Sequence, residues 1–134
     1  MKYHLVNTRI RHSDTAQKRM LKDRVVLACF STRDEIEEIN KGDFVFLYQN
    51  TVGIIAMGKA SGVSEIIDFE RVKDAAMIQS LNGFSRLKTA IHASTVTAIL
   101  QNFADYEKGV FLKTRVEIPA TAGKTLKAIG EVVS

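Results

Sequence analysis

Basic side chains gather in the first quarter of the sequence. Residues 1–33 carry eight lysines and arginines against two aspartates, a local charge of +6, whereas residues 34–134 carry eleven basic and thirteen acidic side chains, a local charge of −2. Guanidinium groups bind phosphate oxygens through two parallel hydrogen bonds, so this asymmetry favours a polyanionic partner such as nucleic acid. The alternative is a solvated basic surface without a partner. We expect phosphate contacts from five side chains: Arg9, Arg11, Lys18, Arg19 and Arg24.

Two stretches resemble parts of catalytic motifs, but each lacks a required glycine. Residues 122–125 (AGKT) are similar to the end of a phosphate-binding loop, and that loop needs a glycine where this chain has Ile118. Residues 83–87 (GFSRL) begin like a nucleophile elbow and lack its closing glycine. The first stretch is more typical of a turn and the start of a helix. We therefore predict that the protein is not an enzyme.

The residue types that bind metals or act as nucleophiles are scattered. The three histidines His4, His12 and His92 show no metal-ligand spacing. Cys29 is the only cysteine and lies in an apolar run, which is typical of an inert buried thiol and excludes an intrachain disulfide. The acidic residues within 34–38 have the pattern of a solvated helix face. The sequence therefore predicts no metal site and no cofactor.

The elements that must position the basic residues are strands and helices in mixed order. The pattern of apolar residues predicts six strands, over 2–7, 25–30, 44–49, 52–60, 87–93 and 110–118. Helical spacing predicts four helices, over 15–23, 72–81, 96–103 and 126–133. Thr32 and Glu35 have the spacing of a capping box and predict a further short helix that ends at Gly42. Because strands and helices do not alternate regularly, we expect an α+β fold with a mainly antiparallel sheet.

Length and composition indicate one folded domain. The chain has 134 residues, of which 46% are hydrophobic and 25% charged, as is usual for a globular domain. Its longest uninterrupted apolar run, residues 25–30, is far shorter than the roughly 20 residues that a membrane span needs. The first residues turn polar before an apolar stretch develops, unlike a secretory signal. We expect a cytoplasmic protein that does not enter a membrane.

Two segments in the first half of the chain resemble a known family. Residues 1–8 (MKYHLVNT) are similar to the opening strand of EVE-domain proteins, which belong to the PUA-like superfamily. Residues 39–48 (INKGDFVFLY) and 52–60 (VGIIAMGKA) are similar to the family's core, in which Lys-Gly-Asp precedes a strand and Gly-Ile opens the next. The resemblance implies a small, partly open β-barrel flanked by helices, with residues 1–134 as a single domain. It also implies a pocket for a flipped, often modified, base.

The resemblance extends to a few candidate pocket residues. Asn7 and Thr8 match the exit of the first strand, and their amide and hydroxyl groups can pair with a base edge. Tyr48 is expected to stack on the base, a contact worth about 1–3 kcal/mol. The family's usual tryptophan after the opening tyrosine is His4 here, and the chain has no tryptophan. His4 or His12 is therefore expected to replace part of the aromatic cage.

These observations favour a non-catalytic module that binds DNA or RNA and recognises a flipped or modified base. Two alternatives stay open: a small hydrolase or nuclease on the same fold, and a regulatory subunit whose basic segment binds an acidic protein. The sequence leaves the oligomeric state open. It further predicts that the turn at Gly42 and Asp43 is structural, with the Asp43 carboxylate accepting backbone N–H groups.

Overall fold

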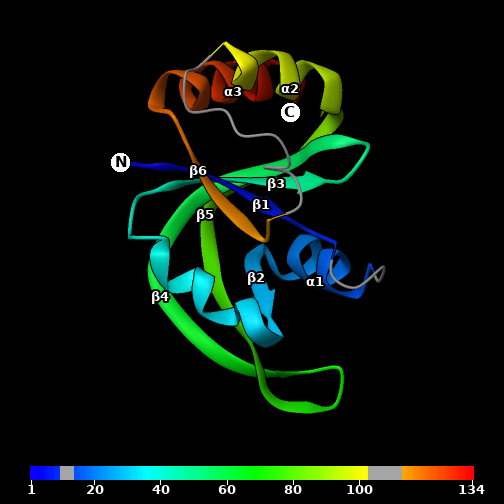
Figure 1. The fold of residues 1–134 in the computed structure, drawn as a ribbon, viewed down its shortest axis with the longest axis vertical. Helices are drawn as coiled ribbons and strands as arrows, with labels where there is room; N and C mark the ends of the chain where they lie inside the picture. Colours follow the sequence, from blue (N-terminus) through cyan, green and yellow to red (C-terminus); the bar gives the residue numbers. More distant parts are fainter. Residues whose placement is uncertain (10–13, 103–112) are drawn as a thin grey trace.

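The fold is organised around one strongly curled sheet. The computed structural model describes residues 1–9, 14–102 and 113–134 (Figure 1). In this part of the chain, six strands pair in the order β2-β5-β4-β3-β1-β6. The pair of β1 with β3 is parallel, and the other pairs are antiparallel. The strands are β1 (Tyr3–Asn7), β2 (Val25–Cys29), β3 (Phe44–Gln49), β4 (Gly53–Phe69), β5 (Val72–His92) and β6 (Arg115–Ile118).

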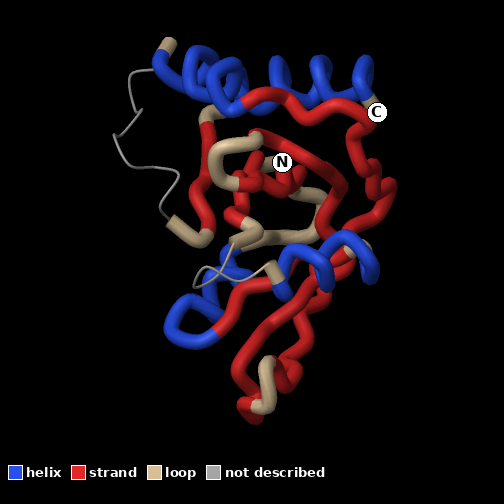
Figure 2. The backbone as a smooth tube through the Cα atoms, turned by 90° about the vertical axis from the view of Figure 1, so that its right-hand side faces the viewer, coloured by secondary structure: helices blue, strands red, loops and turns tan. Residues whose placement is uncertain are grey.

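The helices cover the sheet from two sides. Figure 2 shows two helices side by side at one end of the molecule and the other two near its middle, with the β4–β5 hairpin extending beyond them. None of these helices is both long and apolar enough to cross a membrane. They are α1 (Thr15–Asp23), the 3-10 helix η1 (Phe30–Glu38), α2 (Ala93–Gln101) and α3 (Ala120–Val133).

The two faces of β3 belong to two separate hydrophobic clusters. Phe44, Phe46 and Tyr48 pack with residues of α2 and α3, whereas Val45 and Leu47 pack with residues of α1, β2 and η1. The strand is therefore buried on both faces, and the alternation that the sequence predicts for it is confirmed. Burial on both faces is what a strand near the middle of a sheet with helices on both sides requires.

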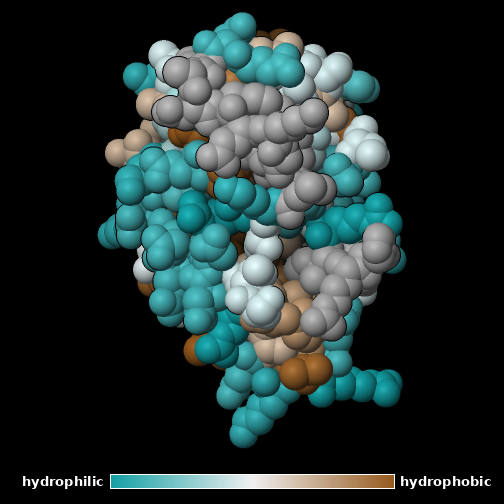
Figure 3. Space-filling model, viewed as in Figure 1, coloured by the Kyte–Doolittle hydropathy of each residue, from teal (hydrophilic) through white to brown (hydrophobic). Residues whose placement is uncertain are grey.

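The outer half of the β4–β5 hairpin is more exposed. Val63, Ile66 and Val72 are exposed apolar side chains in this region. The face of the molecule in Figure 3 is mostly hydrophilic, with hydrophobic atoms gathered toward its lower end and hydrophilic atoms beyond them. Beyond Lys59, where its pairing with β3 ends, β4 pairs only with β5 among the described residues.

Two glycines of α3 allow the helix to approach the sheet closely. A Cβ atom on Gly123 would collide with the ring of Tyr3, and one on Gly130 would collide with the side chain of Met57. The seven-residue spacing places both glycines on one face of the helix. Gly123 therefore serves helix packing, in agreement with the prediction that residues 122–125 are no phosphate loop.

Most predicted elements are present, but two assignments are wrong. The segment predicted as a helix over 72–81 forms the first part of β5, where it pairs with both β2 and β4. The short helix near Thr32 is a 3-10 helix that begins at Phe30, and the Thr32 hydroxyl donates to the carbonyl oxygen of Cys29 instead of capping it. Of the strand predicted over 110–118 and the helix over 96–103, residues 103–112 lie outside the described residues.

Candidate functional site

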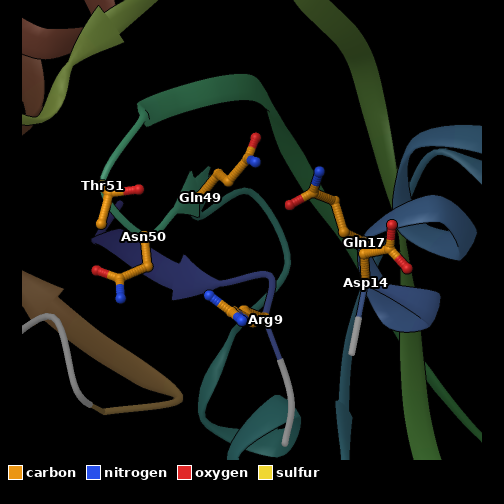
Figure 4. Close-up of a pocket in the computed structure, with 6 residues that line it drawn as sticks. All are labelled: Arg9, Asp14, Gln17, Gln49, Asn50 and Thr51. Atoms are coloured by element: carbon orange, nitrogen blue, oxygen red, sulfur yellow. The ribbon is translucent and has the colours of Figure 1, made fainter. Parts of the chain in front are cut away.

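A polar pocket opens where β1 and β3 end beside the first turn of α1. Its volume is about 320 Å³, near the lower end of the range for ligand pockets (Figure 4). A cavity of this size suits a group as large as one nucleobase. Six described residues line it: Arg9, Asp14, Gln17, Gln49, Asn50 and Thr51.

Thr8 joins the three elements that form the pocket. Its backbone N–H donates to the Tyr48 carbonyl oxygen at 3.0 Å, which continues the β1–β3 pairing by one residue. Its hydroxyl donates to Oε1 of Gln17 on α1 at 2.6 Å. Thr8 is fully buried, so these bonds are shielded from water. The residue thus fixes the position of Gln17 relative to the ends of both strands.

A constrained turn supplies the opposite wall. The carbonyl oxygen of Gln49 accepts a hydrogen bond from the backbone N–H of Val52 at 3.0 Å, which closes a four-residue turn. Thr51 occupies the left-handed region at φ 68°, a strained conformation for a β-branched residue. Gly53 follows at φ 131°, and a Cβ atom there would collide with the backbone of Ile91. The turn that holds Asn50 and Thr51 against the pocket is therefore fixed by its neighbours.

The pocket is equipped for binding by hydrogen bonds and charge. Figure 4 shows Gln17 and Gln49 extending toward each other and the Arg9 guanidinium directed toward Asn50. Asp14 forms an ion pair with Lys18 at 3.5 Å, and both side chains are well exposed. Within the described residues, no group of three histidine, cysteine, aspartate or glutamate side chains is placed to hold a metal ion.

A second polar cluster lies at the other end of the β1–β3 pair, and it is fully enclosed. His4 Nε2 lies 2.8 Å from Oδ2 of Asp43, and Nδ1 lies 3.0 Å from an Arg115 nitrogen. Because a guanidinium only donates, Nδ1 must accept and Nε2 carries the proton that Asp43 accepts. The Asp43 carboxylate also accepts the backbone N–H groups of Lys2 and Asn40, each at 3.0 Å. The prediction that Asp43 accepts backbone N–H groups is therefore confirmed.

The pKa values of this cluster shift in directions that suit a neutral histidine beside a charged aspartate. Burial lowers the pKa of His4, and the positive charge of Arg115 lowers that pKa further. Burial by itself would raise the pKa of Asp43, but hydrogen bonds from Lys2, His4 and Asn40 outweigh burial and lower that pKa. Both shifts favour the hydrogen-bonding arrangement that the structure shows.

None of the predicted base-pocket residues is among the six described residues that line the pocket. The Tyr48 side chain is 3% exposed and packs in the cluster beneath α2 and α3, which contradicts a stacking role. His4 is 1% exposed and engaged by Asp43 and Arg115, so it does not replace a cage residue. Asn7 accepts the backbone N–H of Arg9 through its side chain at 3.0 Å. Asn7 and Thr8 therefore shape the pocket wall, and His12 lies outside the described residues.

The predicted phosphate-binding residues do not gather at one place: only Lys18 and Arg19 lie on α1, while Arg9 precedes it and Arg24 follows it. Arg9 lines the pocket, and Lys18 reaches its rim through Asp14. Arg19 forms an ion pair with Asp23, four residues further along α1. Arg24 caps the far end of the helix in the left-handed conformation, at φ 57°. Arg11 lies outside the described residues, so Arg9 and Lys18 are the predicted cations that the structure brings to the pocket.

The sequence analysis missed several lining residues. In the sequence, Gln17 is an ordinary polar position of the helix predicted over 15–23, and Gln49 is the polar last residue of the strand predicted over 44–49. Asn50 and Thr51 fall between the strands predicted over 44–49 and 52–60, and no pattern in the sequence marks them as part of a site. The available signal was positional: polar residues follow the ends of two strands that are neighbours in the resembled fold, and ligand sites commonly lie at such ends.

Comparisons with known proteins identify the fold. No protein-family model matches the chain. No curated protein matches it by sequence. Solved structures similar to this one include a hypothetical protein from Leishmania major, which is 12% identical with a TM-score of 0.65, covering 98% of this chain and 96% of that one.

Two further similar structures were solved with nucleic acid. Human THYN1 in complex with DNA containing 5-methylcytosine is 10% identical, with a TM-score of 0.61 and 98% of each chain covered. The YTH domain-containing protein mmi1 in complex with RNA is 8% identical, with a TM-score of 0.59, covering 96% of this chain and 82% of that one. The fold is therefore the partly open, PUA-like barrel flanked by helices that the sequence resemblance implies.

Proposed function

We propose that this protein is a non-catalytic module that binds single-stranded or locally opened nucleic acid and holds one base in the polar pocket. The observation that carries the proposal is the pocket itself, because it combines a volume suited to one base with amide groups and the Arg9 guanidinium. The likeness of the fold to THYN1 with DNA and to mmi1 with RNA supports it. The same likeness does not distinguish DNA from RNA for this chain.

The lining favours contact with the edge of a base over stacking on its face. None of the six described lining residues is aromatic. Side-chain amides can pair with base edges through a donor and an acceptor together. A base must leave its stack for its edge to reach such groups, and unpaired bases do so at the smallest cost. We therefore infer a preference for single strands, mismatches or ends over intact duplex.

Phosphate contacts supply the remaining affinity. Arg9 stands at the pocket, and Lys18 lies nearby with its side chain 76% exposed. Neutralising a phosphate releases counterions from nucleic acid, so such contacts make binding strongly dependent on salt. Arg19 and Arg24 extend the basic surface along α1, where a strand leaving the pocket would pass.

The test is a titration of fluorescently labelled single-stranded DNA and RNA by anisotropy, at salt concentrations from about 50 to 200 mM. The wild type is expected to lose affinity steeply with salt. Arg9→Ala is expected to weaken binding to every sequence and to lower the salt slope by about one unit. Lys124→Ala removes an exposed charge from α3 and serves as the control.

Three outcomes of this titration would contradict the proposal. No measurable binding of wild type to any oligonucleotide at low salt would overturn the proposal. Equal losses for Arg9→Ala and Lys124→Ala would show that affinity follows overall charge and not the pocket. Tighter binding to duplex than to single strands would contradict the proposal that a base enters the cavity.

A further inference from the structure

The hydrogen-bonding groups at the pocket are biased toward donors, and this bias bears on which base fits. The inference rests on the proposed function, because it concerns the ligand of the same pocket. We propose that the pocket selects bases that present carbonyl oxygens, such as thymine, uracil and guanine, over cytosine and adenine, which present an amino group in the corresponding position.

The first part of the argument is the orientation of the Gln17 amide. The Thr8 hydroxyl lies 2.6 Å from this amide, a separation typical of an O–H···O bond and shorter than the roughly 2.9 Å of an N–H···O bond. The hydroxyl therefore donates to Oε1 of Gln17. That oxygen is held by the pocket wall, and no described residue accepts from Nε2 of Gln17. The two N–H groups of Nε2 are thus available to a ligand.

The second part concerns the charged residues. Arg9 has five N–H donors and no acceptor. Asp14 is the one acidic residue among the six described lining residues, but its carboxylate pairs with Lys18. In Figure 4 that carboxylate points away from Gln49 and Asn50. Gln17 and Arg9 therefore present donors, and the amide of Gln49, with one acceptor and two donors, balances them only in part.

The edge of thymine or uracil complements this arrangement. It carries two carbonyl oxygens on either side of one ring N–H. The carbonyls can accept from Arg9 and Gln17, while the N–H donates to the Gln49 oxygen. Cytosine has an amino group in place of one of these carbonyls. The amino N–H then faces a protein N–H, so that the protein donor has no acceptor. One such unmatched group corresponds to about a tenfold loss of affinity.

The experiment compares single-stranded oligomers of thymidine and of cytidine, each about ten nucleotides long, the site size of small single-strand binding domains. Both have the same phosphates, so the ratio of their dissociation constants isolates the base. The wild type is expected to bind the thymidine oligomer about tenfold more tightly.

The variant Gln17→Glu replaces the hydrogen-bond donor that residue 17 presents to the ligand with an acceptor. The carboxylate still accepts the Thr8 hydroxyl, but it offers the ligand an acceptor in place of the N–H groups. The ratio is expected to move toward cytidine by about tenfold, although the added negative charge weakens binding to both oligomers. Asn82→Asp makes the same amide-to-acid change at an exposed position on β5 and is expected to leave the ratio unchanged. Thermal melting confirms that each variant is folded.

Three results would overturn the inference in distinguishable ways. Equal affinity of wild type for both oligomers, with Arg9→Ala weakening both, would leave the proposed function standing and refute the selection of carbonyl-bearing bases. A wild-type preference for cytidine would show that the Gln17 amide has the opposite orientation. No binding to either oligomer at low salt would refute the proposed function, and the inference with it.

Discussion

The two ends of the β1–β3 pair hold polar groups of very different kinds. At the beginning of the strands, His4, Asp43 and Arg115 are linked by hydrogen bonds and enclosed by the fold. At the end of the strands, Arg9 and Gln49 face a cavity. The same pair of strands thus carries one polar cluster that holds the structure together and another that is available to a ligand. Most donors and acceptors of the enclosed cluster find partners within the chain, although the buried Nε of Arg115 has none among the described residues.

The comparison predicts that the enclosed cluster governs stability and the open pocket governs binding. Each substitution that follows is therefore measured for both quantities. A variant that changed stability and affinity to the same degree would contradict this division of roles between the enclosed cluster and the open pocket.

The largest effect is expected for Asp43→Ala. The change leaves three donors without an acceptor: the buried N–H of His4 and two partly buried backbone N–H groups. Each such group costs about 1–3 kcal/mol, so we expect a loss of about 3 kcal/mol of unfolding free energy, above the 1 kcal/mol typical of a lost cap. Urea unfolding measures the loss, with the exposed Asp34→Ala as control. A loss of less than about 1 kcal/mol would show that the cluster is not structural.

The next effect is expected for Gln49→Met, a change of similar size that removes the amide from the pocket. We expect affinity for single-stranded oligonucleotides to fall by about fivefold to tenfold, the value of one hydrogen bond, while stability changes by less than about 0.5 kcal/mol. Anisotropy titration and thermal melting provide the two readouts. A loss of stability without a loss of affinity would show that Gln49 supports the fold and does not bind the ligand.

A smaller effect of opposite sign is expected for Thr51→Gly. Glycine adopts a positive φ without steric cost, so the substitution relieves strain and is expected to raise stability by about 1 kcal/mol. It also frees the turn that carries Asn50, so affinity is expected to fall slightly. Chemical denaturation and anisotropy measure the two changes. If the variant is less stable than the wild type, the contacts of the Thr51 side chain stabilise the fold by more than the strained backbone destabilises it.

The smallest change is expected from mild acid. His4 and Asp43 both have a lowered pKa in the folded protein, so the unfolded chain binds more protons. Stability is therefore full above the ordinary histidine pKa of about 6.5, declines below it, and declines again near the ordinary aspartate value of about 3.9. Unfolding measured from pH 8 to 5 is expected to show the first decline, and His4→Gln is expected to reduce it. A rise in stability as the pH falls from 8 to 5, or an undiminished decline in His4→Gln, would contradict the assignment.

The sequence predicts much of the framework because local signals and tertiary structure agree there. Helix α1 and strand β3 follow from the spacing and alternation of apolar residues alone. The helix predicted over 72–81 is wrong, although two of its ten residues are alanines and its apolar residues have helical spacing. Pairing with β2 and β4 then outweighed the helical preference.

The site was harder to predict because its members depend on packing. Tyr48 stands at a strand end, where an exposed ring is plausible, but the clusters on both sides of β3 leave no exposed face. Gln17 becomes a pocket residue only through its contact with Thr8, which requires the relative positions of α1 and β1. No pattern in one sequence encodes that contact. Of the basic residues near the start of the chain, Arg9 lines the candidate pocket.

The place of β1 in the sheet has a consequence for how the protein is made. This strand precedes the other five along the chain, yet its two neighbours in the sheet are β3 and β6, and β6 follows more than a hundred residues later. Until residues 115–118 emerge, one edge of β1 offers its backbone groups to any extended segment nearby. The strand β1 is therefore protected on both sides only after residues 115–118 have been synthesised. A chain truncated before β6 would leave one edge of β1 unpaired. We expect such a chain to bind chaperones or to aggregate.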